Sequence, residues 1–178
     1  MIAGMDWVLV LGGTPLIALG LLDVLLTVLH YDDLGFLSNR LHRGVWTVVR
    51  WVTRALPRKS RNFGLSLGAP LMIPVTILFW AGIEILGFAS VYYAGMGEEN
   101  FAFDNDVEPD FGAALYLSGV TLATLGYGDI TPISPLYEGL ALGEALIGFA
   151  ILSLSISYQR VEKVVIGPVD NPKPHPNT

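Results

Sequence analysis

The sequence contains no cysteine and only three histidines among its 178 residues, so disulfides and thiolate metal sites are excluded. His30, His42 and His175 are scattered and lack the spacing of metal ligands. No serine lies in a nucleophile elbow. Charged residues are also scarce, at 15%, whereas apolar residues make up 52% of the chain. We therefore predict a protein that is not an enzyme and whose surroundings are lipid.

Three apolar stretches are long enough to cross a bilayer, which takes roughly 20 helical residues at about 1.5 Å each. They run from Trp7 to His30, from Phe63 to Tyr93 and from Leu136 to Tyr158. The first has no basic leader and no convincing cleavage site, so we expect it to be retained as a span. The stretch from Gly12 to Pro15 predicts a kink or break within it.

Charge is sorted by region along the chain. Basic residues gather between the first two spans, from Arg40 to Arg61, and acidic residues gather in the next connector, from Glu98 to Asp110. The positive-inside rule places the basic connector in the cytoplasm. The sequence thus predicts a multi-pass protein of the cell (inner) membrane, with the N-terminus outside and the C-terminus in the cytoplasm.

The basic connector has the pattern of an amphipathic helix from Leu37 to Leu56. On a helical wheel its arginines share one face and its aliphatic residues the other: Arg40, Arg43, Arg50 and Arg54 against Leu41, Val45, Val48, Val49 and Val52. This pattern is typical of a helix in the cytoplasmic interface, with arginines on anionic lipid headgroups. Pro57 and the cluster Arg58 to Arg61 are expected to end it. The alternative is a voltage sensor, although the segment is short and only one span precedes it.

A shorter apolar helix, from Phe111 to Thr124, is predicted between the second and third spans. The residues Thr124-Leu125-Gly126-Tyr127-Gly128-Asp129 follow it, and Ser134-Pro135 predicts the N-cap and first turn of the next helix. A half-length helix and this hexapeptide between two spans are similar to the pore unit of the potassium channel superfamily. The resemblance covers roughly Leu67 to Val164 and is to small bacterial channels with one pore loop per subunit.

The resemblance implies an all-α integral membrane protein that assembles as a homotetramer around one pore. Each chain would supply three transmembrane helices, an interfacial helix on the cytoplasmic side, and a re-entrant pore helix with a filter. The predicted parts are an extra transmembrane helix (1–36), the interfacial helix (37–61), the pore domain (62–164) and a disordered tail (165–178).

The filter carries the predicted function. A potassium ion in a narrow pore must exchange its water shell for oxygens, and rings of backbone carbonyls supply them. The resemblance implies ion sites made by the carbonyls of Thr124, Leu125, Gly126 and Tyr127, with the Thr124 hydroxyl. Gly126 and Gly128 permit backbone angles that a Cβ disfavours.

Side chains around the filter are expected to support it, namely Asp129, Tyr116 and Thr121. Tyr116 is placed to bond Asp129. Two departures from the family pattern leave the degree of selectivity open. Leu125 replaces the usual valine, and Val120 stands where some relatives carry a glutamate that pairs with the filter aspartate.

Candidate gating residues are Gly148, Glu144 and Asp23. Gly148 is either a hinge or a position of close helix packing. Glu144 either faces the pore axis or buttresses the pore helix from behind. The buttress role is favoured for Glu144, because an uncompensated carboxylate in the cavity is costly. Asp23 is a hydrogen-bonded packing group or a gating group. His30 and His42 are further groups that titrate near neutral pH.

We predict a potassium-selective channel subunit whose only cofactors are potassium ions. Its partners would be membrane lipids and identical chains, with no nucleic acid. The alternatives are a weakly selective cation channel, a non-conducting membrane regulator and a cation transporter subunit.

Overall fold

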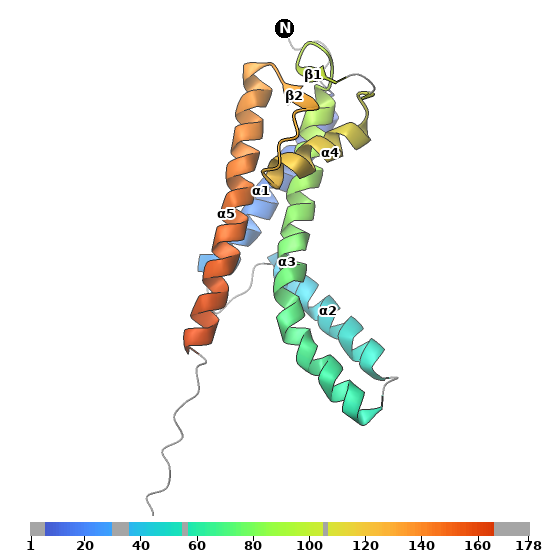
Figure 1. Cartoon of the computed structure of the whole chain (residues 1–178), viewed down its shortest axis with the longest axis vertical. Helices are drawn as coiled ribbons and strands as arrows, with labels where there is room; N and C mark the ends of the chain where they lie inside the picture. The colour runs from blue at the N-terminus through green and yellow to red at the C-terminus, as the bar shows by residue number, and fades with distance from the viewer. Residues whose placement is uncertain (1–5, 30–35, 55–56, 105–106, 166–178) are drawn as a thin grey trace, which may run out of the picture.

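The computed structural model describes residues 6–29, 36–54, 57–104 and 107–165, and Figure 1 shows their arrangement. His30, His175 and nearly all of the predicted tail lie outside these residues. The helices and strands are α1 (Trp7–Leu29), α2 (Phe36–Arg54), α3 (Arg58–Ala94), β1 (Phe101–Phe103), α4 (Phe111–Leu122), β2 (Ile130–Pro132) and α5 (Pro135–Val165).

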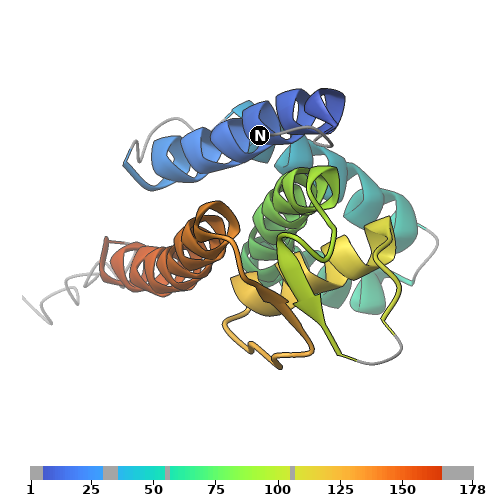
Figure 2. The ribbon, with the colours of Figure 1, turned by 90° about the horizontal axis from the view of Figure 1, so that it is seen from above.

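Three of the helices are long and apolar enough to cross a membrane. The qualifying segments are Trp7–Thr27 in α1, Pro74–Ala94 in α3 and Pro135–Ser153 in α5. α4 is apolar but too short. The three spans and the short helix predicted from hydropathy are therefore confirmed. Viewed from above, α1 lies at the edge of the group and α4 lies on the other side of α3 (Figure 2).

The sequence predicted a kink or a break in the first span. A break is wrong, because α1 continues as one helix through Pro15, and a kink stays a prediction. Packing against α3 provides the reason. A Cβ on Gly13 would lie 2.6 Å from the carbonyl oxygen of Gly87, and a Cβ on Gly87 would lie 2.6 Å from Ile17. Glycine at both positions lets the two backbones approach closely, and this contact holds α1 in place despite the missing proline N–H.

The basic cluster from Arg58 to Arg61 does not end the interfacial helix. α2 already ends at Arg54, and Arg58 begins α3, which runs for 37 residues to Ala94. The predicted boundary at residue 62 therefore falls inside α3. Pro57 precedes the new helix, where the lack of an N–H costs no internal hydrogen bond.

The expectation of a purely helical chain needs one correction. β1 and β2 form a two-stranded antiparallel ribbon in which Phe101 pairs with Pro132 and Phe103 with Ile130. β1 lies in the acidic connector, which composition alone predicted to be a loop. A strand of three residues is too short to reveal itself by alternation of apolar and polar residues.

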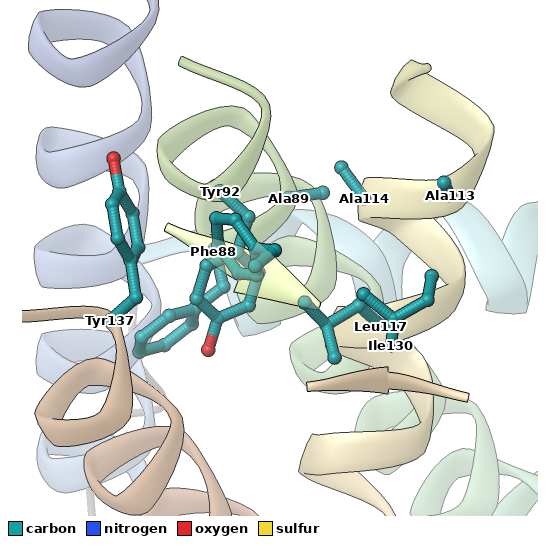
Figure 3. Packing of buried hydrophobic residues seen from close by; sticks show 9 residues of the cluster. Phe88, Ala89, Tyr92, Ala113, Ala114, Leu117, Ile130 and Tyr137 are labelled. Atoms are coloured by element: carbon teal, nitrogen blue, oxygen red, sulfur yellow. The ribbon is translucent and has the colours of Figure 1, made fainter. Parts of the chain in front are cut away.

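A cluster of buried side chains joins α3, α4, α5 and the ribbon (Figure 3). Tyr92 lies at its centre with no exposed surface, and its ring packs against Phe88, Phe101 and Tyr137 at centroid distances of 6.1 to 6.3 Å. Ala89 and Ala114 are also fully buried, so α3 and α4 meet through small residues. This core fixes α4 and the ribbon, which lie on either side of residues 124–129.

Candidate ion-conduction site

The short helix α4 is well capped at its start. Asp110 precedes it, and its Oδ1 accepts a hydrogen bond of 2.7 Å from the backbone N–H of Ala113. A carboxylate at this position also complements the positive end of the helix dipole. The partly negative C-terminal end, at Leu122, lies next to residues 124–129, which we call the filter segment.

Every second residue of the filter segment has a positive φ angle. The values are 57° for Thr124, 52° for Gly126 and 84° for Gly128. Thr124 is the only residue other than glycine with this conformation in the described chain. A left-handed conformation costs a residue with a Cβ roughly 1–2 kcal/mol. Such strain at Thr124 indicates that the surrounding structure demands this backbone path.

The N–H groups of the filter segment turn back toward α4. The carbonyl of Val120 accepts from the N–H of Leu125 at 2.8 Å and of Gly126 at 3.4 Å, and Thr124 donates to the carbonyl of Thr121 at 2.9 Å. The side chain of Val120 cannot act as a brace, but its carbonyl holds the segment. No hydrogen bond within the described residues uses a carbonyl from 124 to 127. These acceptors are left for another partner.

The filter segment is exposed on the isolated chain, with Leu125 58% and Tyr127 66% exposed. The Tyr127 ring stacks on Tyr116, with centroids 6.5 Å apart. A hydrogen bond with the Asp129 side chain raises the pKa of the Tyr116 hydroxyl above its ordinary value. Tyr116 and Asp129 therefore lie close together at the end of the filter segment that leads into β2.

The ribbon anchors the outer end of the filter segment. The Asp129 carbonyl accepts a hydrogen bond of 2.8 Å from the N–H of Asp104, and β2 begins at the next residue. Phe101, on the paired strand, is 1% exposed and its ring lies 4.8 Å from that of Tyr137. Backbone pairing thus supports this end without the glutamate that Val120 replaces. Apart from two phenylalanines within the acidic connector, no feature of the sequence signals this support.

Comparison with known proteins agrees with this geometry. Residues 76–160 match the protein family described as Ion channel. The potassium voltage-gated channel protein shk-1 of Caenorhabditis elegans is 33% identical over 81 residues, covering 45% of this chain and 14% of that protein. The matched region, just under half of the chain, is similar to members of the potassium channel superfamily. This similarity to ion channels also favours the prediction that the protein is not an enzyme.

Two bacterial relatives have less informative names. Protein LctB of Geobacillus stearothermophilus is 32% identical over 85 residues, which cover 44% of this chain and 63% of that protein. The uncharacterized membrane protein YdjJ of Bacillus subtilis is 23% identical over 151 residues, which cover 84% of this chain and 42% of YdjJ. The matched part of the chain thus spans less than two thirds of the length of these relatives. No solved structure gives a significant match.

Gly148 of α5 lies against the end of α4. A Cβ built on Gly148 would overlap the carbonyl oxygen of Leu122 and lie 2.9 Å from its carbonyl carbon. By contrast, a Cβ on Gly139 or Gly143 would meet nothing within 4 Å in the chain. Of the two interpretations of Gly148, close packing therefore has direct geometric support.

Glu144 lies one turn before Gly148 and is fully buried behind α4. Its Oε2 accepts a hydrogen bond of 2.6 Å from the Tyr92 hydroxyl, and its Oε1 accepts one from the Ser118 hydroxyl. The carboxyl thus joins α3, α4 and α5. This position matches the buttress interpretation. Sequence analysis missed Tyr92 and Ser118, although a serine on the apolar face of α4 is a signal for a buried polar partner.

Asp23 connects α1 to the start of α2. Its Oδ1 accepts from the N–H of Leu37 at 2.9 Å, and its Oδ2 accepts from the N–H of Ser38 at 3.2 Å and from the Trp80 indole at 3.0 Å. The Ser38 hydroxyl also donates to Oδ2. The first N–H groups of a helix have no internal acceptor, so a carboxylate from another helix serves as the cap. Asp23 is 3% exposed and holds α1, α2 and α3 together.

Replacing Asp23 with asparagine is expected to destabilise the folded chain by about 2 kcal/mol or more, because an NH2 group would face donors that now meet a carboxylate oxygen. The measurement is thermal unfolding in detergent, together with the rate of trypsin cleavage in α2, which should rise. Asp6→Asn is the matched control, since Asp6 is exposed at the start of the same helix. Equal unfolding temperatures for Asp23→Asn and the wild type would contradict the capping role.

His42 of α2 contacts α3 through Thr76. The two atoms Nε2 and Oγ1 are 2.7 Å apart, and the Thr76 hydroxyl itself donates to the carbonyl of Met72 at 2.8 Å. The hydroxyl proton is thus committed, so His42 Nε2 must be the donor. Burial lowers the pKa of His42 below its ordinary value of 6.5, opposed in part by the negative charge of Asp23.

This lowered pKa predicts a loss of stability in acid. The unfolded chain binds a proton at His42 more readily than the folded chain does. The contribution of His42 to the free energy of unfolding is therefore fully present above about pH 6.5. It is lost as the pH falls through the pKa that His42 has in the folded chain. We expect the unfolding temperature of the wild type to fall more steeply between about pH 7 and pH 5 than that of His42→Gln. His175→Gln serves as the control. Parallel curves for His42→Gln and the wild type would refute the prediction.

Proposed function

We propose that four copies of the chain form a potassium-selective pore, with ion sites made by the carbonyls of the filter segment. The observation that carries the proposal is the backbone of residues 124–128. The φ angle is positive at Thr124, Gly126 and Gly128 and negative at the residues between them. This alternation favours an arrangement in which successive carbonyls point to the same side of the segment. The carbonyls from 124 to 127 have no hydrogen-bond donor among the described residues, so they are available to replace water around a cation.

Assembly of identical chains is supported by what a single chain leaves exposed. Besides the filter segment, α5 carries a stripe of large apolar side chains at helical spacing: Leu142 (65% exposed), Leu146 (62%) and Phe149 (66%). A strained and exposed ion site is not a stable arrangement for one chain alone. Neighbouring copies around a common axis would cover it, and each chain would contribute one carbonyl oxygen to every ring around the ion.

Electrostatics favour a cation over an anion. The C-terminal end of α4 directs partial negative charge toward the region behind the filter segment. Asp129 and the acidic connector lie at the other end, and repetition around an axis would raise the local cation concentration. We propose selectivity for potassium over other cations because of the residue order Thr124-Leu125-Gly126-Tyr127-Gly128-Asp129.

The proposed orientation in the membrane follows from which helices lie at each end of the chain's structure. The start of α1 lies beside the end of α3, since the Asp6 N–H donates to the Ala94 carbonyl at 3.2 Å, and the ribbon lies at this end too (Figure 1). α2 lies toward the other end. We place the first end outside and α2 at the cytoplasmic surface of the inner membrane, where its exposed arginines would contact anionic headgroups.

The proposed division of the chain follows the structure. The pore domain would comprise α3, α4, the filter segment and α5, and so would begin at Arg58 instead of residue 62. α1 would be an additional span beside it, and α2 an interfacial helix.

The test is ion flux into liposomes that contain the purified chain. We expect potassium uptake that exceeds sodium uptake, that barium blocks, and that comes from a tetramer as judged by mass measurement in detergent. Equal potassium and sodium fluxes would replace the proposal with a weakly selective cation channel. A monomer or trimer without flux would refute a conducting pore and favour a membrane regulator.

A further inference from the structure

Glu84 is a buried carboxyl without a partner. It lies within the α3 span, has no exposed surface, and neither of its oxygens meets a hydrogen-bond donor among the described residues. An ionised carboxylate in such surroundings is far more costly than a neutral one, since no hydrogen-bond donor of the described residues offsets its charge. Glu84 therefore has a physical reason to hold a proton, and the function proposed above does not use it.

Helix α1 seals Glu84 from the lipid. A Cβ placed on Gly20 would lie 2.5 Å from Oε1 of Glu84 and 3.2 Å from its carboxyl carbon. Only a glycine leaves room for the carboxyl between α1 and α3. The additional span thus has a specific contact with this group, beyond general helix packing.

The second carboxyl, Glu144, has the opposite surroundings. It is equally buried, but hydroxyls from Tyr92 and Ser118 donate to its two oxygens. Two donors stabilise the charged form of a carboxylate. The two buried carboxyls therefore differ in their surroundings, because Glu144 has two donors and Glu84 has none among the described residues.

We propose that Glu84 and Glu144 form a buried proton-binding pair, which holds one proton on Glu84 at neutral pH and takes up a second on Glu144 in acid. The other titratable groups nearby are Tyr92 on α3, Tyr137 on α5 and Asp23 on α1. Asp23 is occupied by its own donors from α2 and Trp80. A metal ion does not fit as the ligand, because no group of three or more histidine, cysteine or acidic side chains gathers in the described chain.

The pair has a mechanical connection to the pore helix. When Glu144 is charged, its hydrogen bonds to Tyr92 and Ser118 are charge-assisted and hold α4 between α3 and α5. The second proton neutralises Glu144 and weakens both bonds. Protonation would therefore loosen the support of α4, whose end positions the filter segment.

Infrared difference spectroscopy of the full chain in lipid bilayers tests the pair during a pH titration. The carbonyl band of a buried protonated carboxyl reports each step. We expect two steps from the pair in the wild type, one step in Glu84→Gln and one in Glu144→Gln. The matched control is Glu138→Gln, which removes an exposed carboxyl from the same helix as Glu144 and should leave both steps in place.

A further variant keeps the test decisive if the glutamine variants do not fold. Ser118→Ala keeps both carboxyls and removes one donor from the charged form of Glu144, so the acid step should move to higher pH by about one unit or more. Two unchanged steps in Glu84→Gln, or an acid step that Ser118→Ala does not move, would overturn the pair. The measurement needs no ion flux. A chain with both steps but no potassium flux would refute the proposed function alone, and a conducting chain without the steps would refute the pair alone.

Discussion

Gly148→Ala is expected to abolish the proposed ion flux because the chain no longer forms a stable arrangement of α4 against α5. The added methyl group would overlap the carbonyl oxygen of Leu122, a backbone atom at the end of α4 that cannot rotate away. Overpacking in a well-packed core typically costs about 1–3 kcal/mol, and a clash with backbone lies at the upper end or beyond. α4 or α5 must therefore shift, and the filter segment begins only two residues after Leu122.

The measurements are unfolding temperature, oligomer mass in detergent and potassium flux. Gly143→Ala is the matched control, since it adds the same methyl group to the same helix where nothing lies within 4 Å in the chain. We expect the control to fold and conduct as the wild type does. The hinge interpretation makes a different prediction for Gly148→Ala: a channel of normal stability with altered opening. A normal unfolding temperature combined with changed open probability would therefore reject the packing role.

Hydropathy and charge predicted the helices because the position of a helix in a membrane protein depends on whether each segment meets lipid or water. Three apolar stretches of sufficient length can satisfy their backbone groups in lipid only as helices, and α1, α3 and α5 occupy those stretches. The order of residues from Thr124 to Asp129 likewise located the candidate site. Positive φ at Gly126 and Gly128 falls where glycine removes the steric penalty.

Contacts between distant segments could not be predicted in the same way. Pro15 signals a break locally, yet the contact of Gly13 with Gly87 keeps α1 continuous. Asp23 appeared as an isolated acid in an apolar helix, and its role as a cap became visible only when α2 was placed beside it. Thr124 shows the limit most clearly, because its left-handed backbone opposes the preference of a β-branched residue.

The polar groups behind α4 illustrate the same point. Sequence reasoning favoured a buttress role for Glu144 from the cost of an exposed charge in the cavity. It could not name Ser118 and Tyr92, which lie 26 and 52 residues away along the chain. An acid within the long apolar stretch from Phe63 to Tyr93, such as Glu84, is expected to avoid lipid, but the lack of a donor around it among the described residues is a property of the packed structure.

Gly126→Ala is expected to remove potassium conduction while leaving the helices folded. With φ at 52°, an alanine would pay roughly 1–2 kcal/mol in each copy, and four copies around one pore would multiply that cost. The backbone can relieve this strain by rotating the Gly126 carbonyl away from the axis. A ring of ion-binding oxygens would then be lost. Nothing lies within 4 Å of the added methyl group in the single chain, so the rest of the fold has no reason to change.

Two measurements separate loss of the ion site from loss of the fold. Binding of an ion to the folded state alone raises the unfolding temperature by mass action, so the wild type should be more stable in potassium than in sodium. Gly126→Ala should lose that difference together with the flux. Gly119→Ala, in α4, provides the control because its Cβ also meets nothing and its backbone is helical. If Gly126→Ala kept both potassium stabilisation and selective flux, the carbonyl of Gly126 would have no part in ion binding, and the proposed pore would need another set of oxygens.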